Sequence, residues 1–212
     1  DPTTVRTTLG HNNDHGGLAE VMFRPAYYDM LARGGGILAN SALSMAALTL
    51  RVTDDNLALS KLDLLNIETV DTGATGLPGD IGVAWQLRLG NERDYLGPAD
   101  VSNEFFLESG FGKGIALGDT TLYALALGRV QTPDSLDTRF MLLPTLGVLW
   151  QTDAYKGLCK FVFPIRIDSH AYQKKIKSTC EVSAFASKSS DIRLGISHHN
   201  NTELSLSGSW YF

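Results

Sequence analysis

Four histidines near the two ends of the chain could bind a divalent metal or a lipid phosphate. His11 and His15 flank one polar turn, and His198 and His199 precede another. Imidazole is a common metal ligand whose charge changes near neutral pH. A pair of solvated turns is the plainer interpretation, because no Ser-His-acid spacing typical of lipid hydrolases surrounds these residues. The sequence therefore predicts no catalytic residue, no metal ligand and no cofactor.

The two cysteines could form a covalent bond. A two-residue turn at Ser169-His170 would place Cys159 directly opposite Cys180 on neighbouring antiparallel strands. A disulfide is chemically permitted in an oxidising compartment. Two reduced thiols on a lipid-facing surface are the alternative, since a slip of one residue in register removes the pairing. Both outcomes stay open at this point.

Eleven charged residues share the sequence parity opposite to that of the apolar residues around them. Six are basic and five are acidic. In a membrane strand such charges cost several kcal/mol on the lipid side, so they are expected to face inward. Charges of both signs can pair across a small barrel and fill it, which favours a narrow or filled lumen. The predicted lumen charges are Arg6, Glu20, Arg24, Arg88, Glu104, Glu108, Lys175, Lys177, Glu181, Arg193 and Glu203.

Long segments of strict alternation must position these charges. Residues 202–212, 81–90 and 191–197 place apolar and polar side chains on opposite faces, which indicates strands. Most predicted strands exceed the five or six residues usual in soluble proteins and match the roughly nine to eleven that cross a membrane. We therefore predict an all-β fold: a closed antiparallel transmembrane barrel of about twelve strands, at 5–11, 15–25, 41–52, 56–69, 80–91, 103–117, 120–131, 139–152, 155–167, 171–187, 190–199 and 202–212.

Composition agrees with one such barrel domain over residues 1–212. Only 19% of the residues are charged, and the net charge is −5 with no basic face, which argues against nucleic acid as a partner. The longest nearly apolar run, residues 42–50, is about half of what a membrane helix needs. No signal peptide is recognisable at residue 1, so we expect any such segment to be removed or to lie upstream.

An even number of strands places both chain ends on the periplasmic side. Residues 27–40 are then the only long periplasmic link, and we predict that this link docks a periplasmic partner. The leucine parity changes within 56–69, which indicates either a β-bulge or burial on both faces. The residues predicted to form the docking link are Arg24, Pro25, Tyr27, Tyr28 and Asp29.

The C-terminal residues Trp210, Tyr211 and Phe212 end the last alternating strand. Such an ending resembles the terminal signal by which outer-membrane barrels are recognised by the barrel-assembly machinery. A soluble sandwich that happens to end in Phe is the alternative, but it would leave the long strands unexplained.

The run FRPAYYDML at residues 23–31 resembles the C-terminal barrel-like domain of bacterial proteins that carry an N-terminal periplasmic Lnb-type domain. The family pattern there is close to RPAYHDLLD, so Tyr28 replaces its His and Ala32 replaces its last Asp. Weaker matches lie at 59–67, 106–112, 122–125 and 210–212. The resemblance implies an architecture, with a periplasmic domain upstream of residue 1, and implies little about chemistry.

Three functional hypotheses follow for a protein of the bacterial outer membrane. The leading one is a non-enzymatic barrel that anchors or orients a periplasmic domain or envelope partner. The alternative is a narrow channel for small solutes. A second alternative is an outer-membrane enzyme that modifies lipid and uses the four histidines. The expected partners are outer-membrane lipid, lipopolysaccharide, the barrel-assembly machinery and a periplasmic domain or envelope protein.

Overall fold

The computed structural model is a closed barrel of antiparallel strands, and no helix occurs among the residues that it describes. Those residues are 3–13, 16–32, 38–53, 56–73, 82–95, 101–133, 138–167, 176–187, 189–199 and 201–212. The strands are β1 (Thr4–Asn12), β2 (Gly16–Arg24), β3 (Ala26–Tyr28), β4 (Ser41–Thr53), β5 (Asn56–Val70), β6 (Val83–Tyr95), β7 (Val101–Leu117), β8 (Thr120–Pro133), β9 (Arg139–Gln151), β10 (Tyr155–Val162), β11 (Ile165–Arg166), β12 (Lys177–Ser187), β13 (Ser190–His198) and β14 (Thr202–Tyr211).

Two short strands continue the strands that precede them, so the fourteen strands form twelve continuous lengths of barrel wall. We call each of these twelve lengths a stave. Pro25 separates β3 from β2, and Pro164 lies between β10 and β11. Proline has no N–H to donate to the ladder, which interrupts the strand without changing its course. β3 keeps the register of β2 on β4, and β11 keeps the register of β10 on β9. The predicted count of twelve is confirmed.

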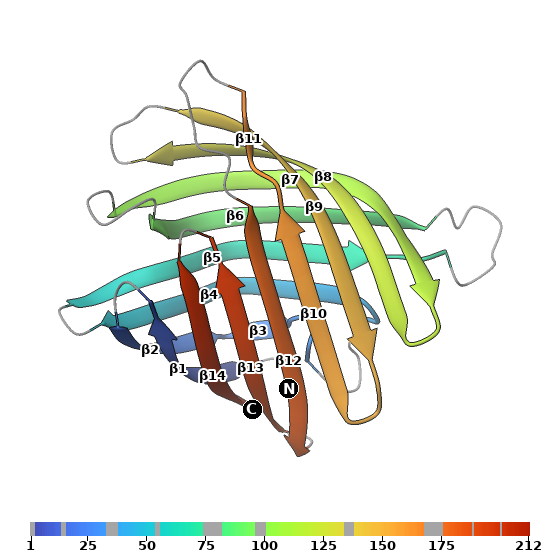
Figure 1. Cartoon of the computed structure of the whole chain (residues 1–212), viewed down its shortest axis with the longest axis horizontal. Coiled ribbons are helices and arrows are strands. Elements are labelled where there is room, and N and C mark those ends of the chain that lie inside the picture. Colours follow the sequence, from blue (N-terminus) through green and yellow to red (C-terminus); the bar gives the residue numbers. More distant parts are fainter. Residues whose placement is uncertain are drawn as a thin grey trace.

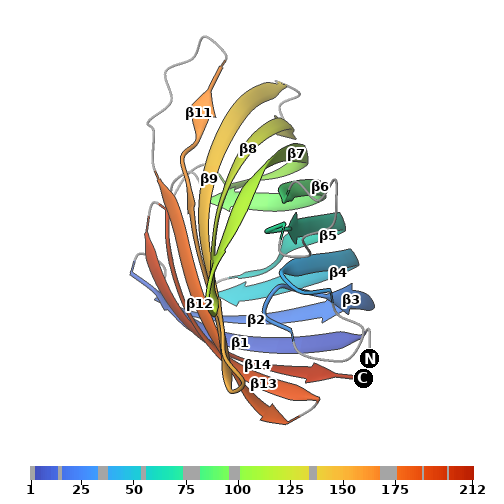
Figure 2. The ribbon, with the colours of Figure 1, turned by 90° about the vertical axis from the view of Figure 1, so that its right-hand side faces the viewer.

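Each stave pairs with the next along the chain, and the first closes on the last. Thr4–Asn12 pairs antiparallel with Thr202–Tyr211 over its whole length. The strands tilt strongly, so β12–β14 cross in front of β4 and β5 in Figure 1, and Figure 2 shows both chain ends at one end of the barrel. We call this the terminal end and the opposite one the far end. Within the described ranges, no helix is long and apolar enough to cross a membrane.

The parity change within β5 has a bulge at each side of it. The pairing of β4 with β5 shifts at Thr49 and Leu50, and the pairing of β5 with β6 shifts between Asp63 and Leu65. An extra residue in one strand moves the following side chains to the opposite face. Of the two explanations that the sequence left open, the bulge is the one observed.

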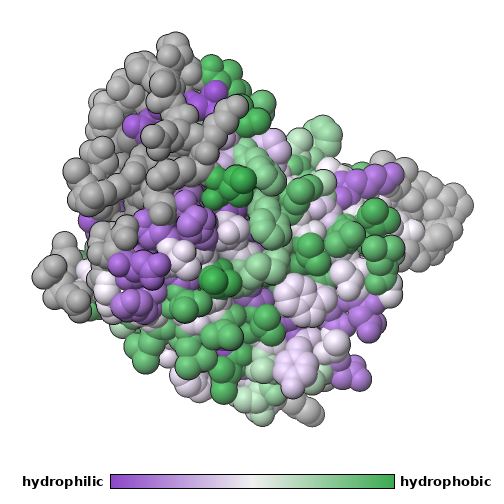
Figure 3. Space-filling view, in the orientation of Figure 1, coloured by the Kyte–Doolittle hydropathy of each residue, from purple (hydrophilic) through white to green (hydrophobic). Residues whose placement is uncertain are grey.

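The outside of the barrel is apolar over its whole circumference. Leu204, Leu206 and Trp210 of β14 are 55%, 54% and 46% exposed, whereas Ser207 and Ser209 between them are buried. Figure 3 shows apolar side chains with small polar ones among them across this wall. Exposed leucines on so many strands are costly in water and favourable in lipid. The alternation predicted for residues 202–212 is confirmed.

All three tryptophans lie near the terminal end, at Trp85, Trp150 and Trp210, close to the ends of β6, β9 and β14. Trp150 packs against the backbone of Gly157, where an added Cβ would lie 1.9 Å from the indole ring. Tryptophan rings concentrate where lipid tails meet headgroups. The terminal end therefore carries one boundary of the membrane-facing band.

The terminal end has a second long connection, which the predicted strands 56–69 and 80–91 already left between them but which the prediction of one long link overlooked. β5 ends at Val70 and β6 begins at Val83, so residues 71–82 join them, and residues 74–81 lie outside the described part. The alternation suggested a strand from residue 80. Gly82 has a φ of 60°, a left-handed conformation that ends the extended run before β6. The link at 27–40 is therefore not the only long one at this end.

Candidate functional site

The terminal half of the lumen is organised around one carboxylate, Asp29. Arg6 of β1 donates to Asp29 Oδ2 at 2.8 Å, Arg24 of β2 at 3.0 Å and Arg193 of β13 at 3.2 Å. Burial alone would raise the pKa of Asp29, but the attraction of Arg193, Arg24 and Arg6 outweighs it and holds the pKa well below its usual range. We call this group of four residues the Asp29 clamp.

Arg193 joins the clamp to the barrel wall. Its side chain is only 2% exposed, and it donates to Asp191 at 2.8 Å, to Glu181 at 2.9 Å and to the Tyr211 hydroxyl at 2.9 Å. Tyr211 in turn donates to Asp191 at 2.8 Å. Tyr211, which the sequence placed in an assembly signal, thus also fixes an arginine inside the lumen. Its role in assembly stays a prediction, as do those of Trp210 and Phe212.

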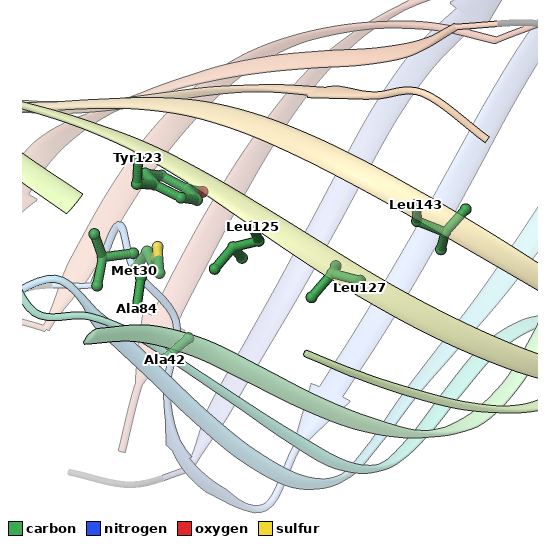
Figure 4. Packing of buried hydrophobic residues seen from close by; sticks show 8 residues of the cluster. Met30, Ala42, Ala84, Tyr123, Leu125, Leu127 and Leu143 are labelled. Carbon is green, nitrogen blue, oxygen red and sulfur yellow. The ribbon is translucent and has the colours of Figure 1, made fainter. Parts of the chain in front are cut away.

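Residues 29–32, which we call the lumen segment, reach from one wall to the other. Asp29 contacts β1, β2 and β13, whereas Lys156 of β10 donates to the Ala32 carbonyl at 2.7 Å. Met30 belongs to a buried apolar cluster with residues of β4, β5, β6, β8 and β9. Figure 4 shows it beside Ala84, across from Tyr123 and Leu125. Met30, Leu31 and Ala32 are at most 5% exposed. The lumen segment therefore lies inside the terminal half of the barrel.

The structure gives the predicted docking link a different place. Arg24, which was predicted both for the docking link and for the lumen, and Asp29, which was predicted for the link alone, are held in ion pairs inside the barrel. Tyr28 donates to or accepts from Ser41 at 3.2 Å beside the same link. Closure explains this position, because only the closed barrel brings β13 within one strand of β1; a docking role for the link stays a prediction. Pro25 is half-buried, and the side chain of Tyr27 lies outside the described part.

The far half of the lumen holds a second charge network, borne entirely by wall strands. Arg88 of β6 and Arg129 of β8 share the carboxylates of Glu92 and Glu108, at 2.6 to 3.7 Å. The two guanidinium groups lie 4.8 and 4.1 Å from the Phe106 ring centre, a cation–π arrangement. We call this set the wall network. It fixes the arginines against the wall and leaves space beside them.

That space is a cavity of about 410 Å³, which we call the vestibule. It reaches from Lys177 and His199, at the far end, down to Glu68 and Thr145 at mid-height. Below it, Tyr123 donates to Glu68 at 3.2 Å and belongs to the cluster that contains Met30. Tyr123 thus connects the lining residue Glu68 with the cluster around Met30, on the terminal side of the vestibule.

The inward position predicted for the charges holds wherever the residue is described. Arg6, Arg24, Arg88, Glu104, Glu108, Glu181 and Arg193 form ion pairs inside the barrel, Glu20 and Glu203 share Arg51, and Lys177 lines the vestibule. Lys175 lies outside the described residues. Several members were missed. Glu92 fell in a predicted loop, because β6 continues to Tyr95, and the β5 bulges hid Asp63 and Glu68.

The histidines and cysteines can be placed as well. His11 and His198 are exposed at the far end, and no group of three metal-ligating side chains occurs among the residues described, which exclude His15. Cys159 and Cys180 occupy paired positions of β10 and β12 and form a disulfide. Their register is the one that the sequence suggested, although residues 168–175 lie outside the described part.

Solved structures with the same fold are outer-membrane porins. Over 99% of this chain, the fold is similar to that of a KdgM porin, with 8% identity, 99% of that chain covered and a TM-score of 0.56. It is similar to that of a NanC porin, with 7% identity over 99% of this chain and 100% of that one, and a TM-score of 0.58. At such low identity the likeness establishes the porin-like fold alone.

The sequence comparisons give a family. No curated protein matches the chain. The profile of a domain of unknown function, DUF7840, matches residues 1–211. Because this match covers nearly the whole chain, the protein belongs to the DUF7840 family.

Proposed function

We propose that this barrel is a closed, non-conducting anchor in the bacterial outer membrane, which holds a periplasmic domain or envelope partner at its terminal end. One observation supports the proposal: the lumen segment contacts β1, β2 and β13 through Asp29, and Met30 belongs to a cluster with residues of β4, β5, β6, β8 and β9, so the segment reaches across the lumen. A barrel that serves for passage of solutes has no need of such a segment. A barrel that serves as an anchor gains stability from it.

The clamp supports a permanently seated segment. Asp29 is a half-buried carboxylate with three arginine partners, two of them buried, and it loses several kcal/mol of favourable interaction if it leaves while the arginines stay. Removal of the segment would also expose Met30 and the cluster around it to water. Both costs oppose opening at neutral pH.

The terminal end supports the placement of the partner. With twelve staves, both ends of the chain lie there, together with the tryptophans. In this proposal the terminal end faces the periplasm. Leu38, which follows the lumen segment, is 69% exposed at this end. The partner-facing part of the link is therefore proposed to be Leu38 and Ala39 in place of Arg24 and Asp29.

Ion conductance in planar lipid bilayers tests the closed lumen. The native barrel is expected to insert without stable current steps. A variant that unseats the lumen segment, Asp29→Ala with Met30→Gly, is expected to give steps, because both of its attachments are weakened. Glu92→Gln, which alters the wall network alone, is the matched control and should stay silent. Stable steps from the native protein would replace the anchor with a channel.

Orientation needs a separate measurement. A protease-sensitive tag placed before residue 1 is expected to resist protease in intact cells and to be cut once the outer membrane is breached. Cleavage in intact cells would place the terminal end outside and remove the periplasmic partner from the proposal.

A narrow channel for small solutes is the second candidate, and the vestibule is the observation that favours it. A cavity of about 410 Å³ already occupies the far half, and both cited structural neighbours are named porins. In that case the lumen segment would act as a gate. Two results together would support this candidate over the anchor. The native barrel would conduct ions, and replacing Asp29 alone would raise that conductance.

A further inference from the structure

The vestibule has a mixed lining. β5, β6 and β7 contribute charged and amide side chains to it. β8, β9 and β10 contribute an apolar patch that continues toward the lumen segment, formed by Leu127, Met141, Leu143 and Val162, and beside it the polar side chains of Arg129, Gln131, Thr145 and Lys160. Its volume of about 410 Å³ falls within the roughly 300 to 1,000 Å³ of small-molecule sites. A solute that fits this space must itself have a polar and an apolar side.

Positive charge exceeds negative charge on the lining. Three carboxylates face the vestibule, and each already has a cationic partner: Glu68 has Lys160, and Glu92 and Glu108 have the two arginines of the wall network. Five cationic side chains line the same space. Asp63, which pairs with Lys61 at 2.8 Å and with Arg88 at 3.1 Å, offsets one of the two surplus charges, and the remaining positive charge favours a ligand with a negative charge.

Among the cationic side chains of the lining, Lys177 is the one most available to a ligand. It lies at the first position of β12, is exposed, and forms no ion pair within 4 Å among the residues that the structure describes. It interacts with Glu92 at longer range, but Arg129 at 2.6 Å and Arg88 at 3.5 Å already hold that carboxylate. A carboxylate that enters from the far end would meet this ammonium group first.

Asn66 supplies a second unmet interaction deeper in the vestibule. Its Oδ1 atom is buried and has no hydrogen-bond partner among the described residues. Buried acceptors of this kind usually have a partner, because an unpaired polar atom loses its hydrogen bonds to water without replacement. Asn66 lies closer to the terminal end of β5 than Lys61 does, so it is on the inner side of the vestibule. A hydroxyl or amine donor at that depth would satisfy it.

We propose that the vestibule binds a small organic anion that carries a hydroxyl or amine donor on an apolar ring or chain. The anionic group pairs with Lys177, the donor reaches Asn66, and the apolar part lies against Leu127, Leu143 and Val162. Binding of this kind does not require the ligand to pass the lumen segment. It is therefore independent of the proposed anchoring function and compatible with a lumen that is closed on the terminal side of the vestibule.

Three related probes separate these contacts. 4-Hydroxybenzoate has all three groups, benzoate lacks the donor, and 4-hydroxybenzyl alcohol lacks the charge. Calorimetric titration of the barrel in lipid nanodiscs, with empty nanodiscs subtracted, is expected to rank them in that order. Loss of the charge should weaken binding about tenfold and loss of the donor about fivefold, which are the effects of one charged and one neutral hydrogen bond.

Variants assign the contacts to residues. Lys177→Met is expected to weaken 4-hydroxybenzoate about tenfold and to leave 4-hydroxybenzyl alcohol unchanged. Asn66→Ala should weaken 4-hydroxybenzoate and leave benzoate unchanged. Lys113→Met is the matched control, because Lys113 is an exposed lysine of β7 outside the vestibule lining, and it should bind all probes as the native barrel does.

Folding of each variant is checked by its shift in gel mobility on heating. No heat of binding for any probe by a folded native barrel would overturn the proposal. So would equal affinity for the three probes, or an effect of Lys113→Met as large as that of Lys177→Met.

Discussion

The two halves of the lumen use similar charges to opposite effect. The Asp29 clamp and the wall network both combine arginines with carboxylates inside the barrel. In the clamp, the carboxylate comes from a segment that is not part of the wall, so the ion pairs draw chain into the lumen. In the wall network, every partner belongs to a strand, so the ion pairs lie against the wall. The presence of both charge signs inside a barrel therefore does not decide whether chain enters the lumen. What decides it is whether one partner of the ion pairs comes from a segment outside the wall.

The largest effect is expected from the clamp. Asp29→Ala leaves the buried Arg24 without any carboxylate partner in the described part of the chain, while Arg6 keeps Glu181 and Arg193 keeps Glu181 and Asp191. It should lower the free energy of unfolding by about 3 kcal/mol, the lower end of the range for a broken buried ion pair. Urea unfolding in lipid vesicles, followed by tryptophan fluorescence, measures it. A loss under about 0.5 kcal/mol, on the scale of an ordinary surface substitution, would mean that the clamp does not hold the segment.

The next largest effect on stability is expected from a substitution of Gly147, which packs against the Tyr123 ring. An added Cβ at Gly147 would lie 2.0 Å from the Tyr123 ring, which belongs to the buried cluster that contains Met30. Gly147→Ala must displace that ring and should cost about 2 kcal/mol, as overpacking of a core does. At Gly128, the nearest atom is 3.9 Å away, so Gly128→Ala is the control in the same unfolding experiment. Equal losses from both would contradict the packing described.

A substitution in the wall network should lower the free energy of unfolding by less. Glu92→Gln removes one carboxylate, but Arg88 keeps Asp63 and Glu108, and Arg129 keeps Glu108. Because the arginines keep partners and the site borders the vestibule, a loss of about 1 kcal/mol is expected, near that of a single hydrogen bond. If thermal unfolding shows a loss as large as that of Asp29→Ala, the two halves do not differ as proposed.

Mild acid should have the smallest effect. The pKa of Asp29 lies well below its usual 3.8, so its contribution to stability is complete above that value and is lost only as the pH falls through the lowered pKa. The difference in melting temperature between the native barrel and Asp29→Asn should be the same at about pH 7.5 and pH 5, and should shrink below about pH 3. A difference that narrows already between those first two values would contradict the low pKa.

The barrel wall could be predicted from the sequence because its signal is local. An outward residue such as Leu204 and an inward one such as Ser207 are fixed by a period of two. The register that joins Cys159 to Cys180 followed from a hypothetical tight turn, and the observed pairing agrees. The position of each stave is determined by the alternation in its own sequence and by pairing with the neighbouring staves.

The lumen segment could not be predicted, because its position depends on contacts far apart in the sequence. Asp29 and Arg193 are 164 residues apart, and only closure brings them together. Met30 and Leu31 show no alternation that would indicate burial. The same limit applies to Glu92, which lies at the end of the alternation before a loop, and to Asp63, whose parity follows a bulge.

The lumen segment itself can be tested by chemical accessibility. With the native disulfide intact, Leu31→Cys should react with a water-soluble maleimide about a hundredfold more slowly than Leu38→Cys, and equally fast after denaturation. The reason is that Leu31 is 3% exposed, whereas Leu38 is 69% exposed. Slow labelling confined to position 31 would place the segment inside a closed barrel. Equal labelling of the two folded variants would show that the lumen is open and that the segment does not fill it.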